Sequence, residues 1–395
     1  MHNPVSDNLA AKSPGSNRGV ESCATAIDSS RPLYIGSDVY RRAAFGSNHP
    51  LNIVRHSAVL DVVRMMGWLQ DEDFINTGPA SVARLLEYHD PDYVEALQYA
   101  ESEGRVSPEI RRRYHIGTLE NPLFKGLFER AATTVAGSIR AAEVASEGRT
   151  AFHPSGGTHH GRPDRASGFC YFNDPVFAIR TLLDKGQGRV IYVDLDAHHG
   201  DGVETAFAEE PRVMTISVHE ADRWPYTGAA DDRQHGNARN LPVPRGFNDT
   251  ELSYLLDSAI LPLKERFDPD AVVLCCGADC LAGDPLSGMM LSNVALWDAI
   301  DRLVRPGEPG VVLGGGGYNP WTVTRYWAGL WARLSGYEIP PQLPADVVEY
   351  MHTMECDLVD EDEIERAWLT TMADSPYPGP VREAIKLTAE TAMAN

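Results

Sequence analysis

The sequence lacks long hydrophobic runs, paired cysteine motifs and an N-terminal basic stretch. No apolar run among its 395 residues is long enough to span a membrane. No basic segment followed by an apolar core opens the chain, so we expect no signal peptide. Its six cysteines include no two CxxC pairs at zinc-finger spacing. The cysteine pattern does not resemble the framework of a disulfide-stapled secreted protein. We therefore expect a protein of the reducing cytoplasm.

Cationic residues are also scarce. The chain has 35 Lys and Arg residues against 56 Asp and Glu residues, for a net charge of -21. An acidic chain repels phosphate backbones, so we expect no nucleic-acid partner and no membrane partner. A lysine-bearing peptide or a polyamine is electrostatically favoured as a partner. Composition does not decide between a monomer and a homo-oligomer.

Composition along the chain predicts one large domain with two extensions. Residues 1–30 are rich in Ser, Asn, Ala and Gly without an apolar period, which predicts a disordered N-terminal tail. Residues 31–375 have a globular composition without internal repeats or a dividing linker, and we interpret them as a single catalytic domain. Residues 376–395 are expected to form a C-terminal helical extension. The acidic run at 361–366 predicts a solvated helix face, with a contact to a partner as the alternative.

Strand-like and helix-like segments alternate through the domain. Several strand-like runs, such as AVVLCC at 271–276, are apolar throughout, which is typical of parallel strands buried on both faces. The pattern predicts an α/β fold of three αβα layers around a central, mainly parallel sheet. The predicted strands are 149–153, 189–194, 212–219, 271–276 and 310–313. The predicted helices are 122–145, 174–185, 250–266, 292–305 and 321–334.

Polar residues directly after two of these strands predict a metal site, because ligand sites of such sheets lie at the carboxyl ends of the strands. Asp194, Asp196 and His198 follow one strand at a spacing of two, which places them on one face of an extended chain. Asp279 follows another strand. Two carboxylates and one imidazole leave a coordination position for water, as in catalytic zinc sites. A solvated acidic loop is the alternative interpretation of the first segment.

Two further strand ends carry groups for acid–base and oxyanion chemistry. Adjacent His159 and His160 follow a Gly-Gly turn, and imidazole titrates near neutral pH. Four glycines at 314–317 precede Tyr318, whose phenol can donate to an oxyanion. The glycine run has neither the lysine of a phosphate loop nor the spacing of a dinucleotide fingerprint. Each signal alone is weak, but all are predicted at the same edge of the sheet.

Four segments in this order resemble the zinc-dependent histone deacetylases of the arginase–deacetylase fold. They are HPSGGTHHGRPDRASGFCYFND, VDLDAHHGDGVE, GADCLAGDP and LGGGGYNP, at 153–174, 193–204, 277–285 and 313–320. The resemblance runs from about residue 32 to 334 and is nearer to the class I and acetoin-utilisation-type branch than to the acetylpolyamine branch. It implies one zinc ion per chain, with Fe2+ as an alternative in the cell, and a structural K+ ion.

The resemblance also implies a role for each residue of the predicted site. Zinc would be held by Asp196, His198 and Asp279. His159 and His160 would be the acid/base pair, oriented by Asp194 and Asp201 respectively, and Tyr318 would be the oxyanion donor. The monovalent cation would lie beside Asp194, Asp196, His198 and Ser217.

An acyl-lysine tunnel is implied at the same site, with walls of Gly168, Phe169, Trp224 and Leu286. Glu120 stands where the family often has a rim aspartate that holds the substrate backbone. Trp224 stands where the family more often has Phe, and the PYTG segment after it departs from the usual spacing. These departures affect the part of the site that selects the substrate.

The predicted function is therefore zinc-dependent hydrolysis of an acyl amide, expected to be acetyl, on the lysine side chain of a protein or peptide. Deacylation of small amines such as acetylpolyamines is one alternative. A non-catalytic acyl-group sensor is another, although every motif position is filled. A two-manganese ureohydrolase is a third alternative. It would need several more Asp and His ligands to hold two metal ions, and this chain supplies one clear site.

Overall fold

The computed structural model describes residues 31–42, 44–46, 49–305 and 307–394, so the predicted disordered tail at 1–30 lies outside the described residues. In this part of the chain eight strands form one sheet, in which every neighbouring pair is parallel. From edge to edge the strands are β2 (Phe74–Asn76), β1 (Leu33–Gly36), β3 (Thr150–His153), β8 (Gly310–Leu313), β7 (Ala271–Cys275), β4 (Val190–Asp194), β5 (Val213–Glu220) and β6 (Ala238–Val243).

Alternation along the central strands builds a core on each face of the sheet. In β4, Ile191 and Val193 belong to one apolar cluster, and Val190 and Tyr192 belong to another. All four side chains are buried. A strand that is covered on both faces has apolar residues at every position. This explains the uninterrupted apolar runs in the sequence.

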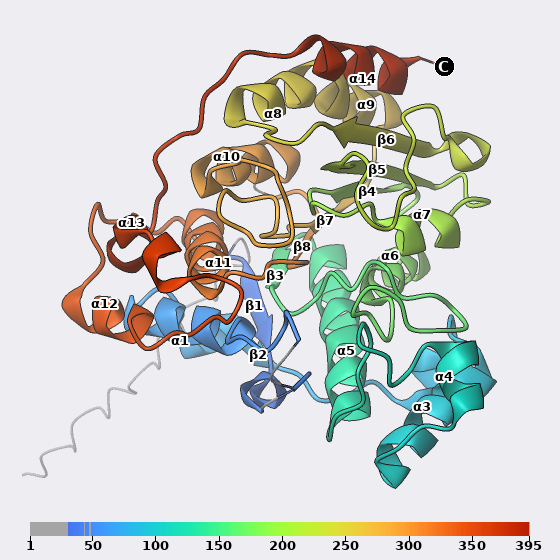
Figure 1. Cartoon of the computed structure of the whole chain (residues 1–395). Helices are drawn as coiled ribbons and strands as arrows, with labels where there is room; N and C mark the ends of the chain where they lie inside the picture. The colour runs from blue at the N-terminus through green and yellow to red at the C-terminus, as the bar shows by residue number, and fades with distance from the viewer. Residues whose placement is uncertain (1–30, 43, 47–48, 306, 395) are drawn as a thin grey trace, which may run out of the picture.

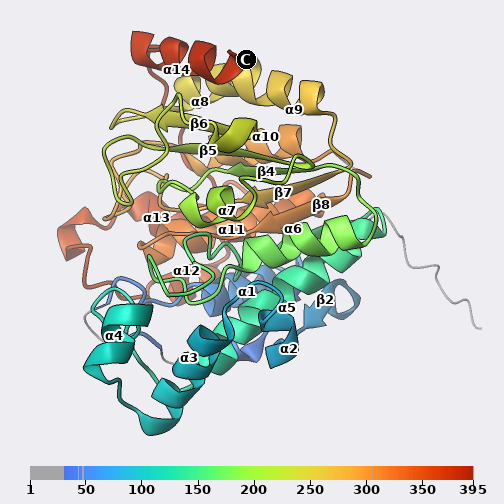
Figure 2. The same ribbon diagram turned by 90° about the vertical axis from the view of Figure 1, so that its right-hand side faces the viewer.

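Helices cover both faces of the sheet (Figures 1 and 2). The cluster around Val190 includes side chains of α5 (Leu127–Ser146), α6 (Asp174–Asp184) and α7 (Asp201–Ala206). The cluster around Ile191 includes α1 (His56–Met65), α8 (Asp249–Leu255), α10 (Asn293–Leu303) and α11 (Pro320–Leu334). The described fold is therefore the predicted three-layer αβα arrangement around a parallel sheet. No helix in the described ranges combines the length and apolar character needed to cross a membrane.

The other helices lie at the ends and margins of these layers. They are α2 (Val82–Leu85), α3 (Pro91–Glu103), α4 (Pro108–Tyr114), α9 (Leu261–Phe267), α12 (Ala345–Met351), α13 (Arg366–Thr370) and α14 (Glu383–Met393). Figure 1 shows α14, in red, beside α8 and α9, and it also contacts the edge strand β6. Short 3-10 helices lie at Asp38–Arg41, Asp71–Asp73, Gln234–Gly236 and Glu361–Glu363.

The structure differs from the predicted elements in several places. Helices α1, α2, α3, α4, α7, α12 and α13 were not predicted. Strands β1, β2 and β6 were not predicted, and β6 carries Arg239 and Pro242, which break an apolar pattern. The helix predicted from residue 122 begins only at Leu127, after Gly126 in a left-handed conformation with φ 82°. The helix predicted over 250–266 contains a π-helical turn at Leu256–Ile260, next to Pro262, a residue that cannot donate a backbone hydrogen bond. The acidic run at 361–366 contains an exposed 3-10 turn instead of a longer helix face.

Candidate active site and metal centre

The predicted metal ligands converge where β4 and β7 end. The two strands pair with Asp194 beside Cys275, so the segments that follow them leave the sheet together. Nδ1 of His198 lies 2.8 Å from Asp279 Oδ2 and 3.3 Å from Asp196 Oδ1. One ligand atom from each of these three residues lies within 4.8 Å of the others. Three groups that are distant in sequence are thus placed around one point.

Burial makes the negative charge of this cluster costly. Asp196 and Asp279 are buried, and only 11% of the His198 side chain is exposed. Burial and the neighbouring charge of Asp196 raise the pKa of Asp279. Burial also opposes ionisation of Asp196, but His159 and His198 outweigh it and lower its pKa. A cation between the carboxylates would relieve this repulsion.

The donor set fits a catalytic zinc ion. Two carboxylates and one imidazole are zinc ligands, and three protein ligands leave a position for water. Backbone groups hold the carboxylates in place: Gly316 N–H donates to Asp196 Oδ2 at 2.6 Å, and Ala197 N–H donates to Asp279 Oδ1 at 2.9 Å. Such contacts orient metal ligands and tune their affinity.

The two adjacent histidines each face a carboxylate. Nδ1 of His159 lies 2.7 Å from Asp194 Oδ2, and Nδ1 of His160 lies 2.8 Å from Asp201 Oδ1. Because an ionised carboxylate only accepts hydrogen bonds, Nδ1 carries the hydrogen in each pair. Nε2 of His159 lies 3.8 Å from Asp196 Oδ1. The structure thus brings together both predicted histidine–carboxylate pairs beside the three candidate metal ligands, Asp196, His198 and Asp279, which we call the metal cluster.

The environments of the two histidines drive their pKa values apart. Burial disfavours the charged form of His159, but the charges of Asp194 and Asp196 outweigh it and raise its pKa to about 9. Burial and the charge of His159 lower the pKa of His160 to about 4. Their ring centroids are only 3.9 Å apart, so two positive charges are disfavoured there. These opposite shifts favour the charged form of His159 and the neutral form of His160.

Tyr318 is positioned by a carboxylate that the sequence analysis did not single out. Its backbone N–H donates to Asp284 Oδ2 at 2.7 Å, and Leu286 N–H donates to Asp284 Oδ1 at 2.9 Å. The Tyr318 ring lies 6.5 Å from the His198 ring. Burial, together with the charges of Asp279 and Asp196, raises the pKa of Tyr318 well above 10. The phenol therefore stays protonated and able to donate.

The predicted tunnel residues border one pocket above the cluster. Glu120, Gly168, Phe169, Trp224 and Leu286 line it together with His160, His198 and Tyr318. The Trp224 ring is 4.6 Å from the His160 ring, and the Phe169 ring is 5.9 Å from the Tyr318 ring. Tyr226, 76% exposed, adds an aromatic side chain at its rim.

One carboxylate oxygen of Glu120, the residue predicted to hold the substrate at the rim, already binds another part of the protein. Oε1 of Glu120 accepts the backbone N–H of Gly168 at 2.6 Å, so this oxygen shapes the tunnel wall. Asn121 Oδ1 accepts the N–H of Phe169 at 3.0 Å. These two side chains hold Gly168 and Phe169, whose φ values of 53° and 67° lie in the left-handed region.

The residues predicted for the monovalent cation also lie close together. Asp194 and Ser217 are paired positions on the neighbouring strands β4 and β5. Asp194 Oδ2 accepts hydrogen bonds from Tyr192 Oη at 2.6 Å and from His159. Ser217 Oγ lies 3.0 Å from Nδ1 of His219.

Three residues that contact the predicted site residues were not predicted from the sequence. Asp284 lies within a quoted motif but is separated from Tyr318 by 34 positions, and only the fold brings them together. Arg162 forms an ion pair with Asp201. Tyr192 lies inside a strand, where its apolar ring predicts core packing and conceals its hydrogen bond to Asp194.

We expect Gly277→Ala to weaken metal binding. A Cβ atom at this position would lie 2.3 Å from Asp196 Oδ2 and 2.7 Å from Asp196 Cα, so the ligand would have to move. Metal content after dialysis measures the effect, with Gly78→Ala as the control because nothing lies within 4 Å of its added Cβ. Equal metal content in both variants would show that Asp196 is not a ligand.

A metal cluster at the carboxyl ends of parallel strands, with acid–base groups within reach, is the arrangement of a metal-dependent amidohydrolase. Residues 49–334 match the family model described as the histone deacetylase domain. The chain belongs to the histone deacetylase family, and its fold is the arginase–deacetylase fold.

Individual relatives agree with this assignment. The acetoin utilization protein AcuC of Bacillus subtilis is 32% identical over 329 residues, which cover 78% of this chain and 84% of that protein. Histone deacetylase 8 of Xenopus tropicalis is 33% identical, over 73% of this chain and 80% of that protein. The crystal structure of an HDAC homolog from Aquifex aeolicus superposes with a TM-score of 0.87 at 35% identity, covering 92% of this chain and 100% of that one. An HDAC homolog solved in complex with SAHA matches with the same TM-score at 34% identity.

Proposed function

We propose that the protein hydrolyses the acyl amide, in the first place acetyl, of a lysine side chain in a protein or peptide, using one zinc ion. The observation that supports this most is the convergence of Asp196, His198 and Asp279 beside two carboxylate-bound histidines. Fe2+ suits the same donor set as an alternative metal. The printed names of histone deacetylase 8 and of the HDAC homolog point to deacetylation.

Zinc, when bound by Asp196, His198 and Asp279, would polarise the amide carbonyl and acidify a water molecule. His160, neutral at pH 7, accepts the proton of the attacking water. His159 holds a positive charge beside the reacting centre and is kept in place by Asp194. Tyr318 donates its phenolic proton in a hydrogen bond to the developing oxyanion. A proton held by the histidine pair then passes to the leaving amine.

The tunnel suits an unbranched amine. Phe169 and Trp224 offer aromatic surface to the apolar stem, with Gly168 and Leu286 completing the wall. We propose that Glu120 contacts the substrate at the rim, and that K+ is held near Asp194, Asp196, His198 and Ser217. We further propose cytoplasmic residence, one catalytic domain at 31–375 and an extension at 376–395.

We expect the rate to fall on both sides of a plateau as the pH changes. Below the pKa of His160 this base is protonated, so kcat/KM decreases on the acid side. Above about pH 9, His159 loses the proton that Asp194 and Asp196 help it retain, so kcat/KM decreases on the alkaline side as well.

Asp194→Asn removes one of the charges that raise the pKa of His159, so its alkaline limb should move to lower pH. The pH profile of kcat/KM measures this, and exposed Asp184 provides the matched control variant Asp184→Asn. An alkaline limb that stays in place in Asp194→Asn would contradict the role of this pair.

The proposed reaction is tested with acetyl-lysine peptides and acetylated polyamines as substrates, with zinc content measured on the same samples. We expect turnover of the peptides to exceed that of the polyamines. Preferential turnover of the polyamines would favour the small-amine alternative. Absence of turnover by a fully metallated protein would favour an acyl-group sensor.

A further inference from the structure

A second cavity leads inward from the metal cluster. It has a volume of about 110 Å³ and is bordered at one end by Asp196, His198 and Tyr318. Its other lining residues include two arginines, Arg55 and Arg130. One water needs roughly 10–15 Å³ of such volume, so the cavity exceeds what an acetyl methyl group would fill.

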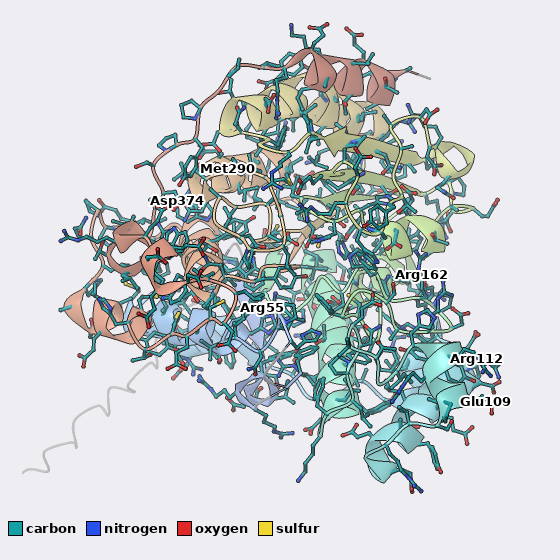
Figure 3. All side chains as sticks on the ribbon, viewed as in Figure 1. Arg55, Glu109, Arg112, Arg162, Met290 and Asp374 are labelled. Atoms are coloured by element: carbon teal, nitrogen blue, oxygen red, sulfur yellow. The ribbon has the colours of Figure 1, made fainter. Side chains whose placement is uncertain are left out.

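Arg55 lies directly behind the metal cluster. Its Nη1 donates to the carbonyl of Gly317 at 2.9 Å, and the N–H of the preceding Gly316 donates to Asp196. Its guanidinium also lies over the ring of Trp327, 5.3 Å from the centroid. Figure 3 shows Arg55 in the middle of the molecule, beside α1.

Arg130, in α5, brings a second positive charge to the same cavity. Its guanidinium lies over the ring of Tyr40, 5.0 Å from the centroid, and makes one long hydrogen bond of 3.4 Å to the carbonyl of Val39. The Tyr40 ring is 5.1 Å from the His56 ring, and Nε2 of His56 lies 3.2 Å from Nη2 of Arg55. The Tyr40 and His56 rings, which meet edge-on, thus lie between the residues that the two arginines contact.

Neither arginine has an acidic partner among the residues that the structure describes. The ion pairs there leave both guanidinium groups without a carboxylate, although most other arginines have one. Two guanidinium charges without a direct ion pair in a confined cavity are costly, and an anion that contacts them would lower this cost. The charges of Asp196 and Asp279 act on Arg55, but these carboxylates accept backbone N–H groups and make no ion pair with it, which leaves its guanidinium open to a carboxylate carried by the substrate.

We propose that the cavity binds acyl groups that end in a carboxylate, of the succinyl or glutaryl class, and that the protein removes these groups from lysine. This specificity rests on the proposed amide hydrolysis. Water adds to the acyl carbon next to nitrogen, the C–N bond breaks and the amine takes a proton. The products are the peptide with an unmodified lysine side chain and the dicarboxylic acid, whose distal carboxylate would be bound by the guanidinium groups that Arg55 and Arg130 present to the cavity. A guanidinium binds a carboxylate through paired, charge-assisted hydrogen bonds.

The first test compares succinyl-lysine with butyryl-lysine in the same peptide, because the two acyl chains have equal length and differ in the terminal charge. We expect kcat/KM of the zinc-loaded protein to be at least about tenfold higher for the succinyl peptide. Acetyl-lysine turnover is measured alongside. Normal deacetylation with no preference for succinyl over butyryl would overturn this inference and leave the proposed function standing. Failure to hydrolyse any of the three would overturn both.

The second test uses Arg130→Met, which removes the charge and keeps a long side chain. We expect the succinyl-to-acetyl ratio of kcat/KM to fall by at least about tenfold, and Arg130→Lys to retain more of it. Arg140→Met is the control, since Arg140 lies on the same helix but pairs with Glu143 at the surface. A ratio that Arg130→Met leaves unchanged would contradict the proposal.

A binding measurement separates acyl recognition from product capture. In the Tyr318→Phe background, calorimetry should show tighter binding of the succinyl peptide than of the butyryl peptide, and Arg130→Met should remove the difference. If Arg130→Met changes only inhibition by added acetate, the arginines capture free carboxylate products and the proposed substrate class is wrong.

Discussion

Replacing Tyr318 with phenylalanine is expected to lower kcat by about a hundredfold or more, while folding and zinc content stay normal. The phenol is the oxyanion donor in the proposed reaction, and loss of one such donor typically costs 10²–10³ in rate, or about 2.7–4 kcal/mol. Its raised pKa keeps it protonated, so it can donate across the working pH range. The backbone N–H of residue 318 still binds Asp284 in the variant, so the loop should keep its conformation.

The measurement is kcat on an acetyl-lysine peptide with zinc determined on the same preparation. Tyr350→Phe is a suitable control, because the Tyr350 hydroxyl binds Asp61, away from the metal cluster. Turnover of Tyr318→Phe close to that of the wild type would remove Tyr318 from the mechanism.

The second large effect is expected for Asp279→Ala, which removes one of the three ligands. Changes in residues that merely orient a ligand already cost 10- to 100-fold in metal affinity, so loss of the ligand itself should cost at least about a hundredfold. The Ala197 N–H would also lose its acceptor, so a modest loss of thermal stability should accompany the loss of metal.

Zinc affinity by competition with a chelator measures this effect. The matched control is Asp257→Ala, whose carboxylate pairs with Arg302 at the surface. Wild-type zinc affinity in Asp279→Ala would mean that the ion is held elsewhere.

The fold was predictable from sequence where strands are buried on both faces. Every position of a strand such as AVVLCC must be apolar, because side chains on both faces of the sheet are buried. These uninterrupted apolar runs identified β7 and β4 in the sequence. The edge strand β6 was missed because one side of an edge strand faces no further strand, so Arg239 and Pro242 are tolerated there. Strand β2 has only three residues, too few for a period to be recognised.

The site was predictable as far as its residues carry strong local patterns. The spacing of Asp194, Asp196 and His198 and the paired histidines are visible without a structure. The role of Asp284 depends on a contact across 34 positions, and the unpaired state of Arg130 depends on what surrounds α5 in space. Such properties arise from tertiary packing, which no local pattern encodes.

In the proposed reaction one metal ion, held by Asp196, His198 and Asp279, supports amide hydrolysis. The most direct test removes all metal by chelation and then titrates zinc into the protein while acetyl-lysine hydrolysis is followed. We expect activity to be absent without metal and to reach its maximum at one zinc per chain. Full activity of the metal-free protein, or a requirement for a second zinc, would contradict the account.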